Sequence, residues 1–105
     1  MKEFSALPYN IIWELQDNVR YLEDYLFGVK ELELLLRVLG PDHPDTLNTM
    51  HGIAIALYNQ GKYEEALKFY QEVLDKRKQI LGPDHPETLR TMYNIAGALN
   101  WLGNN

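Results

Sequence analysis

The sequence has 105 residues, of which 46% are apolar and 24% are charged, a composition typical of one soluble globular domain. It contains no cysteine, which excludes disulfides and thiolate metal sites and fits a cytoplasmic location. The net charge is −5 and nine of the 15 acidic residues lie within residues 1–45, so we expect no nucleic-acid binding. No apolar run approaches the roughly 18 residues that would cross a membrane.

Residues 1–38 carry leucine, isoleucine and tyrosine at helical spacing. The pattern predicts two helices, over residues 5–16 and 19–38, and the second could be broken near Gly28. The apolar positions form three groups that we expect to pack in the core: Leu7, Ile11, Ile12 and Leu15; Tyr21, Leu22, Tyr25 and Leu26; Leu32, Leu35, Leu36 and Leu39.

One phrase, LGPDHP, occurs at residues 39–44 and again at 81–86, 42 positions later. Over the longer segments 39–61 and 81–103, 15 of 23 positions are identical, and the shared ones are mainly apolar, small or turn-forming. A repeat of 20 to 50 residues is typical of helical arrays. The chain is therefore predicted to contain successive copies of one structural unit.

The repeated phrase is predicted to be a connector between helices. Its Gly-Pro pair can end one helix, and the second proline fits the first turn of the next. Asp84 and Glu87 have the spacing of a capping box. The Asp and His side chains could also bind a metal ion, but a metal ion needs several ligands that converge on one point. The two copies of the phrase lie in different helix connectors, so they would not share an ion. We expect a structural role and no metal.

After the first connector, helices are predicted over residues 45–60, 63–81 and 87–102, with no strand. The apolar face of the first comprises Leu47, Met50, Ile53, Ala54 and Leu57, and that of the second comprises Tyr63, Ala66, Leu67, Tyr70, Val73, Leu74 and Leu81. Small alanines on both helices would allow a close antiparallel hairpin. The basic run 75–78 is interpreted as a helix C-terminal turn, where cations complement the helix dipole.

This hairpin resembles a tetratricopeptide repeat. The matching positions are Met50, Ile53, Ala54, Leu57, Gly61, Tyr63, Ala66 and Tyr70. The 42-residue period and the connector are similar to those of the kinesin-light-chain type. The resemblance implies an all-α, right-handed superhelical array of antiparallel helix hairpins, here with five to six helices.

The expected organisation is a single helical-repeat domain over residues 1–105. Residues 39–80 would be a full repeat and residues 81–105 a half repeat that ends the array. Residues 1–38 are either a degenerate first repeat or an N-terminal helical cap. The cap is suggested because residues 4–38 resemble the helical segment that precedes such repeats in nephrocystin-like signalling proteins.

No catalytic constellation is evident. The sequence has no cysteine nucleophile, no G-x-S-x-G, no phosphate-binding glycine loop and no H-E-x-x-H. His51 is the only histidine outside the connectors. We therefore expect no enzyme, no cofactor and no small-molecule substrate.

The resemblance implies that the first helix of each unit lines a concave groove that binds a peptide. The positions concerned differ between the two copies, and they are Asn48, His51, Ile55, Tyr58, Asn59, Arg90, Tyr93, Asn94, Asn100 and Trp101, with glycines at 52 and 97. Asn94 matches the asparagine that binds peptide backbone in such repeats, whereas Gly52 departs from it. Trp101 could instead cover the end of the stack.

The expected function is a protein-interaction scaffold that holds a peptide or helix. The clamp that binds chaperone C-termini in this family needs Lys and Asn at positions occupied here by His51, Ile55, Tyr93 and Gly97, so such binding is not expected. The alternative is a structural, regulatory or self-associating piece of a larger signalling NTPase, because Ile95, Leu99 and Leu102 on the last helix would be partly uncovered and a homodimer could bury them.

Overall fold

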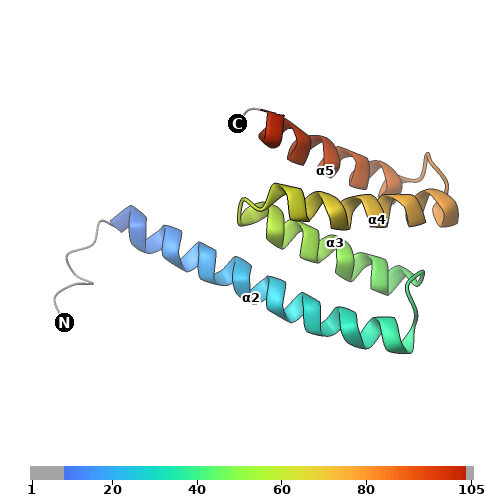
Figure 1. The fold of residues 1–105 in the computed structure, drawn as a ribbon, viewed down its shortest axis with the longest axis horizontal. Coiled ribbons are helices and arrows are strands. Elements are labelled where there is room, and N and C mark those ends of the chain that lie inside the picture. The colour runs from blue at the N-terminus through green and yellow to red at the C-terminus, as the bar shows by residue number, and fades with distance from the viewer. Residues whose placement is uncertain (1–8, 104–105) are drawn as a thin grey trace.

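The structure is a computed structural model that describes the backbone of residues 9–103 and the side chains of residues 15–103. Four helices follow one another in that range: α2 (Tyr9–Val38), α3 (Pro44–Asn59), α4 (Tyr63–Leu81) and α5 (Pro86–Gly103). No strand occurs among these residues. Each helix packs antiparallel against the next in the chain, which gives a row of helices measuring 55 × 35 × 19 Å (Figure 1).

The N-terminal region differs from its prediction. Instead of two helices over 5–16 and 19–38, a single uninterrupted helix covers Tyr9–Val38, so residues 9–103 hold four helices rather than five or six. The polar stretch near residue 17 does not end the helix, because no proline follows it before residue 38 and extending an existing helix costs little. The first part of α2 extends beyond the other helices (Figure 1).

Gly28 lies inside α2 and serves the packing of α2 on α3. A Cβ atom at this position would lie 2.8 Å from Cγ1 of Ile53, a side chain that is only 1% exposed. The missing side chain therefore allows the two helices to approach closely. The predicted break near Gly28 is wrong, because a glycine only weakens a helix interior while this contact stabilises it.

This contact predicts opposite effects for two glycine substitutions. Gly52 also lies in a helix interior, but a Cβ there would meet nothing within 4 Å. Gly52→Ala should gain up to about 1 kcal/mol from helix propensity, whereas Gly28→Ala also overpacks Ile53. We expect the free energy of unfolding of Gly28→Ala to lie about 2 kcal/mol below that of Gly52→Ala in urea titrations. Equal values would show that α2 and α3 can separate without cost.

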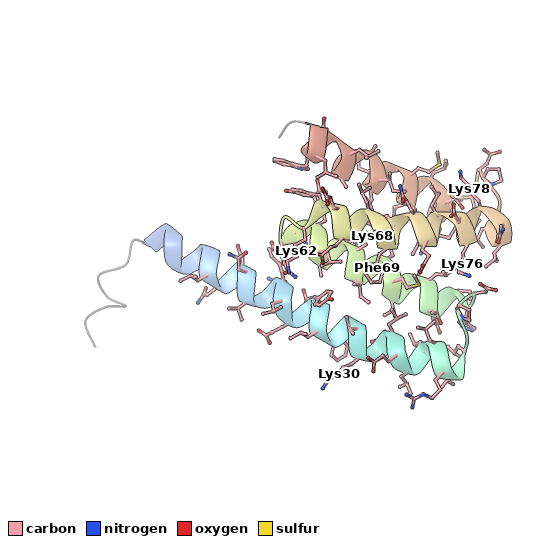
Figure 2. The ribbon with its side chains drawn as sticks, viewed as in Figure 1. Lys30, Lys62, Lys68, Phe69, Lys76 and Lys78 are labelled. Carbon is pink, nitrogen blue, oxygen red and sulfur yellow. The ribbon has the colours of Figure 1, made fainter. Side chains whose placement is uncertain are left out.

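The core lies along α3 and α4, as the repeat pattern predicted. Leu47, Met50, Ile53, Ala54 and Leu57 of α3 are all buried. On α4, the residues Ala66, Tyr70 and Val73 are buried, and Phe69 packs against the core clusters at both ends of the hairpin (Figure 2). Leu81, expected in this face, is 39% exposed because it is the last residue of α4.

Only one side of α2 takes part in the core. Tyr25, Val29 and Leu32 pack against the buried residues of α3 and α4. Lys30 projects away from the other helices (Figure 2). The expected core positions Leu15, Leu22, Leu26, Leu36 and Leu39 are exposed, because α2 has apolar residues on more than one side and α3 covers only one of them. Leu7, Ile11 and Ile12 lie outside the described side chains.

The connectors have the predicted backbone but a different cap. Gly40 and Gly82 have φ values of 88° and 97°, and Pro86 is the first residue of α5. The cap of α5 is His85, whose Nδ1 accepts a hydrogen bond of 3.1 Å from the backbone N–H of Glu87. His43 does the same for Asp45 at the start of α3. The capping box from Asp84 is therefore wrong, because Asp84 lies one residue too early.

The histidine cap of α5 gives a second prediction. His85→Ala should lower the free energy of unfolding by about 1 kcal/mol, since it leaves the N–H of Glu87 without its acceptor. His85→Asn should retain most of the stability, because asparagine is itself a favourable cap. Thermal unfolding of the two variants beside the wild type measures the difference. An alanine variant as stable as the asparagine variant would contradict the cap.

Candidate functional site

An open pocket lies where α3, α4 and α5 meet. Its volume is about 570 Å³. Five of the ten residues proposed from the sequence line it: Ile55, Tyr58, Asn59, Tyr93 and Asn94. Tyr70, Ala96 and Gly97 complete the lining. Half of the candidate positions that differ between the two repeat copies are thus brought together around one cavity.

The five other candidates do not line this pocket and lie in different settings. Arg90 and Asn100 are exposed on α5, and Asn48 is exposed on α3. His51 is only 2% exposed, so its ring lies inside the molecule. Trp101 stacks parallel to Tyr63 with ring centroids 5.7 Å apart.

Aromatic rings connect the three helices beside the pocket. Tyr63, at the start of α4, lies edge-on to Tyr58 with ring centroids 5.1 Å apart, and it stacks on Trp101 of α5 on its other side. Such pairs stabilise a contact by about 1 kcal/mol beyond the area that they bury. These two ring contacts therefore fix the position of Tyr58 at the pocket wall, while Trp101 is still 48% exposed.

Behind the pocket lies a buried polar network centred on Arg77 of α4. Arg77 is 2% exposed, and its guanidinium donates to His51 Nδ1 at 2.9 Å, to Thr91 Oγ1 at 2.8 Å and to Asn48 Oδ1 at 2.9 Å. The carboxylate of Glu87 lies 3.6 Å away and balances its charge. Because its acceptors come from α3 and α5, one side chain holds three helices together.

His51 extends this network toward the pocket. Its Nδ1 faces Arg77, and its Nε2 lies 2.7 Å from the side-chain amide of Asn94, which lines the pocket. Burial, together with the charges of Arg77 and Arg90 and against the opposing effect of Glu87, lowers the pKa of His51 to about 4. The imidazole is therefore neutral at pH 7.

Tyr70 joins the same network to the pocket wall. Its ring lies edge-on to that of His51, with centroids 5.4 Å apart, and it is one of the lining residues. Burial, together with the neighbouring Tyr58, raises the pKa of Tyr70 to about 12. The phenol therefore stays protonated at pH 7 and offers no negative charge to a ligand.

The sequence analysis does not identify Arg77 as a buried residue, because the basic run 75–78 also suits a helix terminus. A signal for it was present: Ala66, Tyr70, Val73 and Arg77 follow one another at steps of four, three and four, which is one helical face. Arg77 thus continues the buried face of α4. A cation on such a face needs partners from neighbouring helices.

Among the described residues, no three His, Cys, Asp or Glu side chains come close enough to hold a metal ion. None of the four helices is both long and apolar enough to cross a membrane. The candidate site is thus a pocket with aromatic and amide groups at its surface and a buried cation behind it.

Comparison with known proteins agrees with the repeated hairpin. Residues 46–87 match a family model described as Tetratricopeptide repeat, and this span is one period of the repeat found in the sequence. A comparison with curated proteins gave no match. The helical unit within residues 46–87 is therefore of the tetratricopeptide-repeat type, a unit that generally mediates protein–protein interaction.

Proposed function

We propose that this chain is a protein-interaction scaffold that binds a peptide or helix in the pocket between α3, α4 and α5. The observation that carries the proposal is the lining of the pocket. Its residues on α3, Ile55, Tyr58 and Asn59, differ from their counterparts 42 positions later, whereas the core residues are shared. A surface that varies on a constant frame is what partner recognition requires.

The chemistry of the pocket suits a peptide with an apolar or aromatic side chain. Tyr93 is 79% exposed and borders the pocket, so its ring is available to a partner. Exposed tyrosines are frequent anchors of binding energy at interfaces. Asn59 and Asn94 add amide groups that can bond a peptide backbone. A partner would thus be anchored by its side chain and oriented by its backbone.

The wider proposal keeps the organisation expected from the sequence. The chain would be a cytoplasmic, non-enzymatic array of the kinesin-light-chain type with a right-handed superhelix, and 1–38 would be its cap or degenerate first repeat. Residues 39–80 would be the full repeat and residues 81–105 the half repeat. Origin from a nephrocystin-like signalling protein fits the same arrangement. Nucleic acids, membranes and small-molecule substrates are not among the proposed partners.

A comparative pull-down tests the groove. The double variant Tyr93→Ala and Asn94→Ala should lose partners that the wild-type chain captures, because it removes an anchor and an amide from one wall. A matched control is Phe27→Ala with Lys30→Ala, which also removes an exposed aromatic and a polar group, but from α2. Equal recovery with the groove variant and the wild type would contradict the assignment.

The second candidate function is self-association through the outer side of α5. Of the three residues expected to be partly uncovered, Leu99 is 52% exposed, and Ile95 and Leu102 are partly buried. Leu89 and Met92, which are 48% and 43% exposed, extend this apolar stripe along α5 at helical spacing. A second copy could bury this stripe, and such a role fits a regulatory part of a larger signalling NTPase. Light scattering over a hundredfold concentration range tests it. A 12.3 kDa monomer at every concentration would exclude self-association.

A further inference from the structure

The buried network fixes the position of one proton. Arg77 Nη1 lies 2.9 Å from His51 Nδ1, and both side chains are only 2% exposed. A guanidinium carries only hydrogen-bond donors and stays charged in proteins. Nδ1 must therefore be the unprotonated, accepting nitrogen. Since a neutral imidazole carries one proton, that proton is on Nε2.

The position of this proton decides how the amide of Asn94 is turned. The amide is placed with Nδ2 2.7 Å from His51 Nε2, an arrangement that would bring two N–H groups face to face. The oxygen and nitrogen of an asparagine amide have nearly the same shape, so its hydrogen bonds decide between the two orientations. A protonated Nε2 requires an acceptor. Oδ1 of Asn94 therefore faces His51, and its NH₂ group is turned the other way.

We propose that Arg77 and His51 are positioning residues that hold the Asn94 amide with its NH₂ group available to the pocket, so that a ligand must place a hydrogen-bond acceptor there. The matching acceptor on a peptide is a main-chain carbonyl oxygen. This inference rests on the proposed function, because it names which group of a bound peptide the pocket selects. It also explains why a cation lies behind a pocket whose wall carries neutral groups.

The arrangement gives the pocket a fixed polarity. Arg77, His51 and Asn94 thus form a hydrogen-bond relay. Without this relay, Asn94 could turn its amide and accept or donate equally well. With the relay, an amide that turned round would lose its bond to His51 and set two donors against each other in a partly buried place. A ligand that offers a donor at this point should therefore bind about tenfold more weakly than one that offers an acceptor.

Nuclear magnetic resonance of the full chain tests the relay without a ligand. Long-range proton–nitrogen correlations of the His51 ring at pH 7 should show hydrogen on Nε2 and none on Nδ1. Arg77→Leu should remove this preference and give a mixture of tautomers, whereas Arg77→Lys, which keeps a donor, should retain it. Hydrogen on Nδ1 in the wild type would overturn the proposal.

Two replacements of His51 then test its effect on binding. His51→Gln can accept from Arg77 and donate to Asn94, so it preserves the polarity, whereas His51→Leu does neither. The probe is a ten-residue peptide selected by display on the wild-type chain. It should bind His51→Gln like the wild type and His51→Leu about twofold more weakly, because a freely turning amide presents its NH₂ group only half of the time. Both variants are compared only if their circular dichroism shows the wild-type helix content.

The outcomes separate the two proposals. Equal binding of the probe to His51→Leu and His51→Gln would overturn the relay while leaving the groove in place. If the display yields no peptide that Tyr93→Ala weakens, the proposed groove function fails, and the tautomer measurement alone then decides whether the relay exists. If His51→Leu does not fold, the Arg77→Leu and Arg77→Lys pair makes the same comparison.

Discussion

Replacing Arg77 with alanine is expected to lower the free energy of unfolding by about 3 kcal/mol. The change removes a large buried side chain and leaves His51 Nδ1 and Thr91 Oγ1, both in buried residues, without their donor. Breaking a buried, charge-assisted network by deleting one member is among the costliest single substitutions, since the remaining polar groups stay desolvated. Urea titration followed by circular dichroism measures the loss.

A matched control separates this effect from that of charge alone. Arg90 also contacts the carboxylate of Glu87, at 3.2 Å, but its side chain is 57% exposed. Exposed ion pairs contribute little, so Arg90→Ala should cost less than about 0.5 kcal/mol. Combining Arg77→Ala with His51→Ala should cost less than the two single changes together, by about 1 kcal/mol, because both remove the same bond. A strictly additive double variant would contradict the network.

The helix boundaries of the repeated part could be predicted from the sequence. The expected spans 45–60, 63–81 and 87–102 lie within one residue of α3, α4 and α5 at each end. The physical reason is that each end is marked by residues with local effects. Glycines at 40, 61 and 82 adopt positive φ, and prolines at 44 and 86 begin the next helices. Local signals of this kind need no knowledge of the tertiary structure.

The N-terminal region could not be predicted equally well, because its signals are not local. Leu22, Leu26 and Leu36 occupy positions that suit a core, and only the placement of α3 decides that Tyr25, Val29 and Leu32 are packed instead. A helix with apolar residues on several sides does not specify which side is covered. The same ambiguity explains why the sequence predicts two helices where the structure has one, α2.

The pocket was predictable in part, for a related reason. Comparison of the two repeat copies separates shared core positions from variable ones, and this identified Tyr58, Tyr93 and Asn94 at the pocket. Variability does not separate surface from interior, however. His51 varies between the copies and is nevertheless buried, because Arg77 on the neighbouring helix gives its ring a partner. Such a pair joins two helices and is not visible in either segment alone.

We expect the folded protein to lose stability in acid, because the unfolded chain takes up a proton on His51 more readily than the folded chain does. Its pKa is about 4 in the folded chain and 6.5 when unperturbed, so between these values the unfolded state binds a proton that the folded state does not. Stability must then rise with pH in this window and fall as the pH is lowered. At pH 4 the loss due to His51 should reach about 3 kcal/mol relative to pH 7.5, where both states are neutral.

The variant His51→Gln isolates this contribution from that of every other titrating group. Glutamine keeps the bonds to Arg77 and Asn94 but cannot take up a proton. Urea titrations at intervals from pH 7.5 to pH 4 should therefore show a wild type that loses stability more steeply than the variant, with the difference beginning near pH 6.5. Parallel curves would mean that the folded chain accepts the proton as easily as the unfolded one. That result is incompatible with an imidazole whose Nδ1 is occupied by a guanidinium that cannot give way.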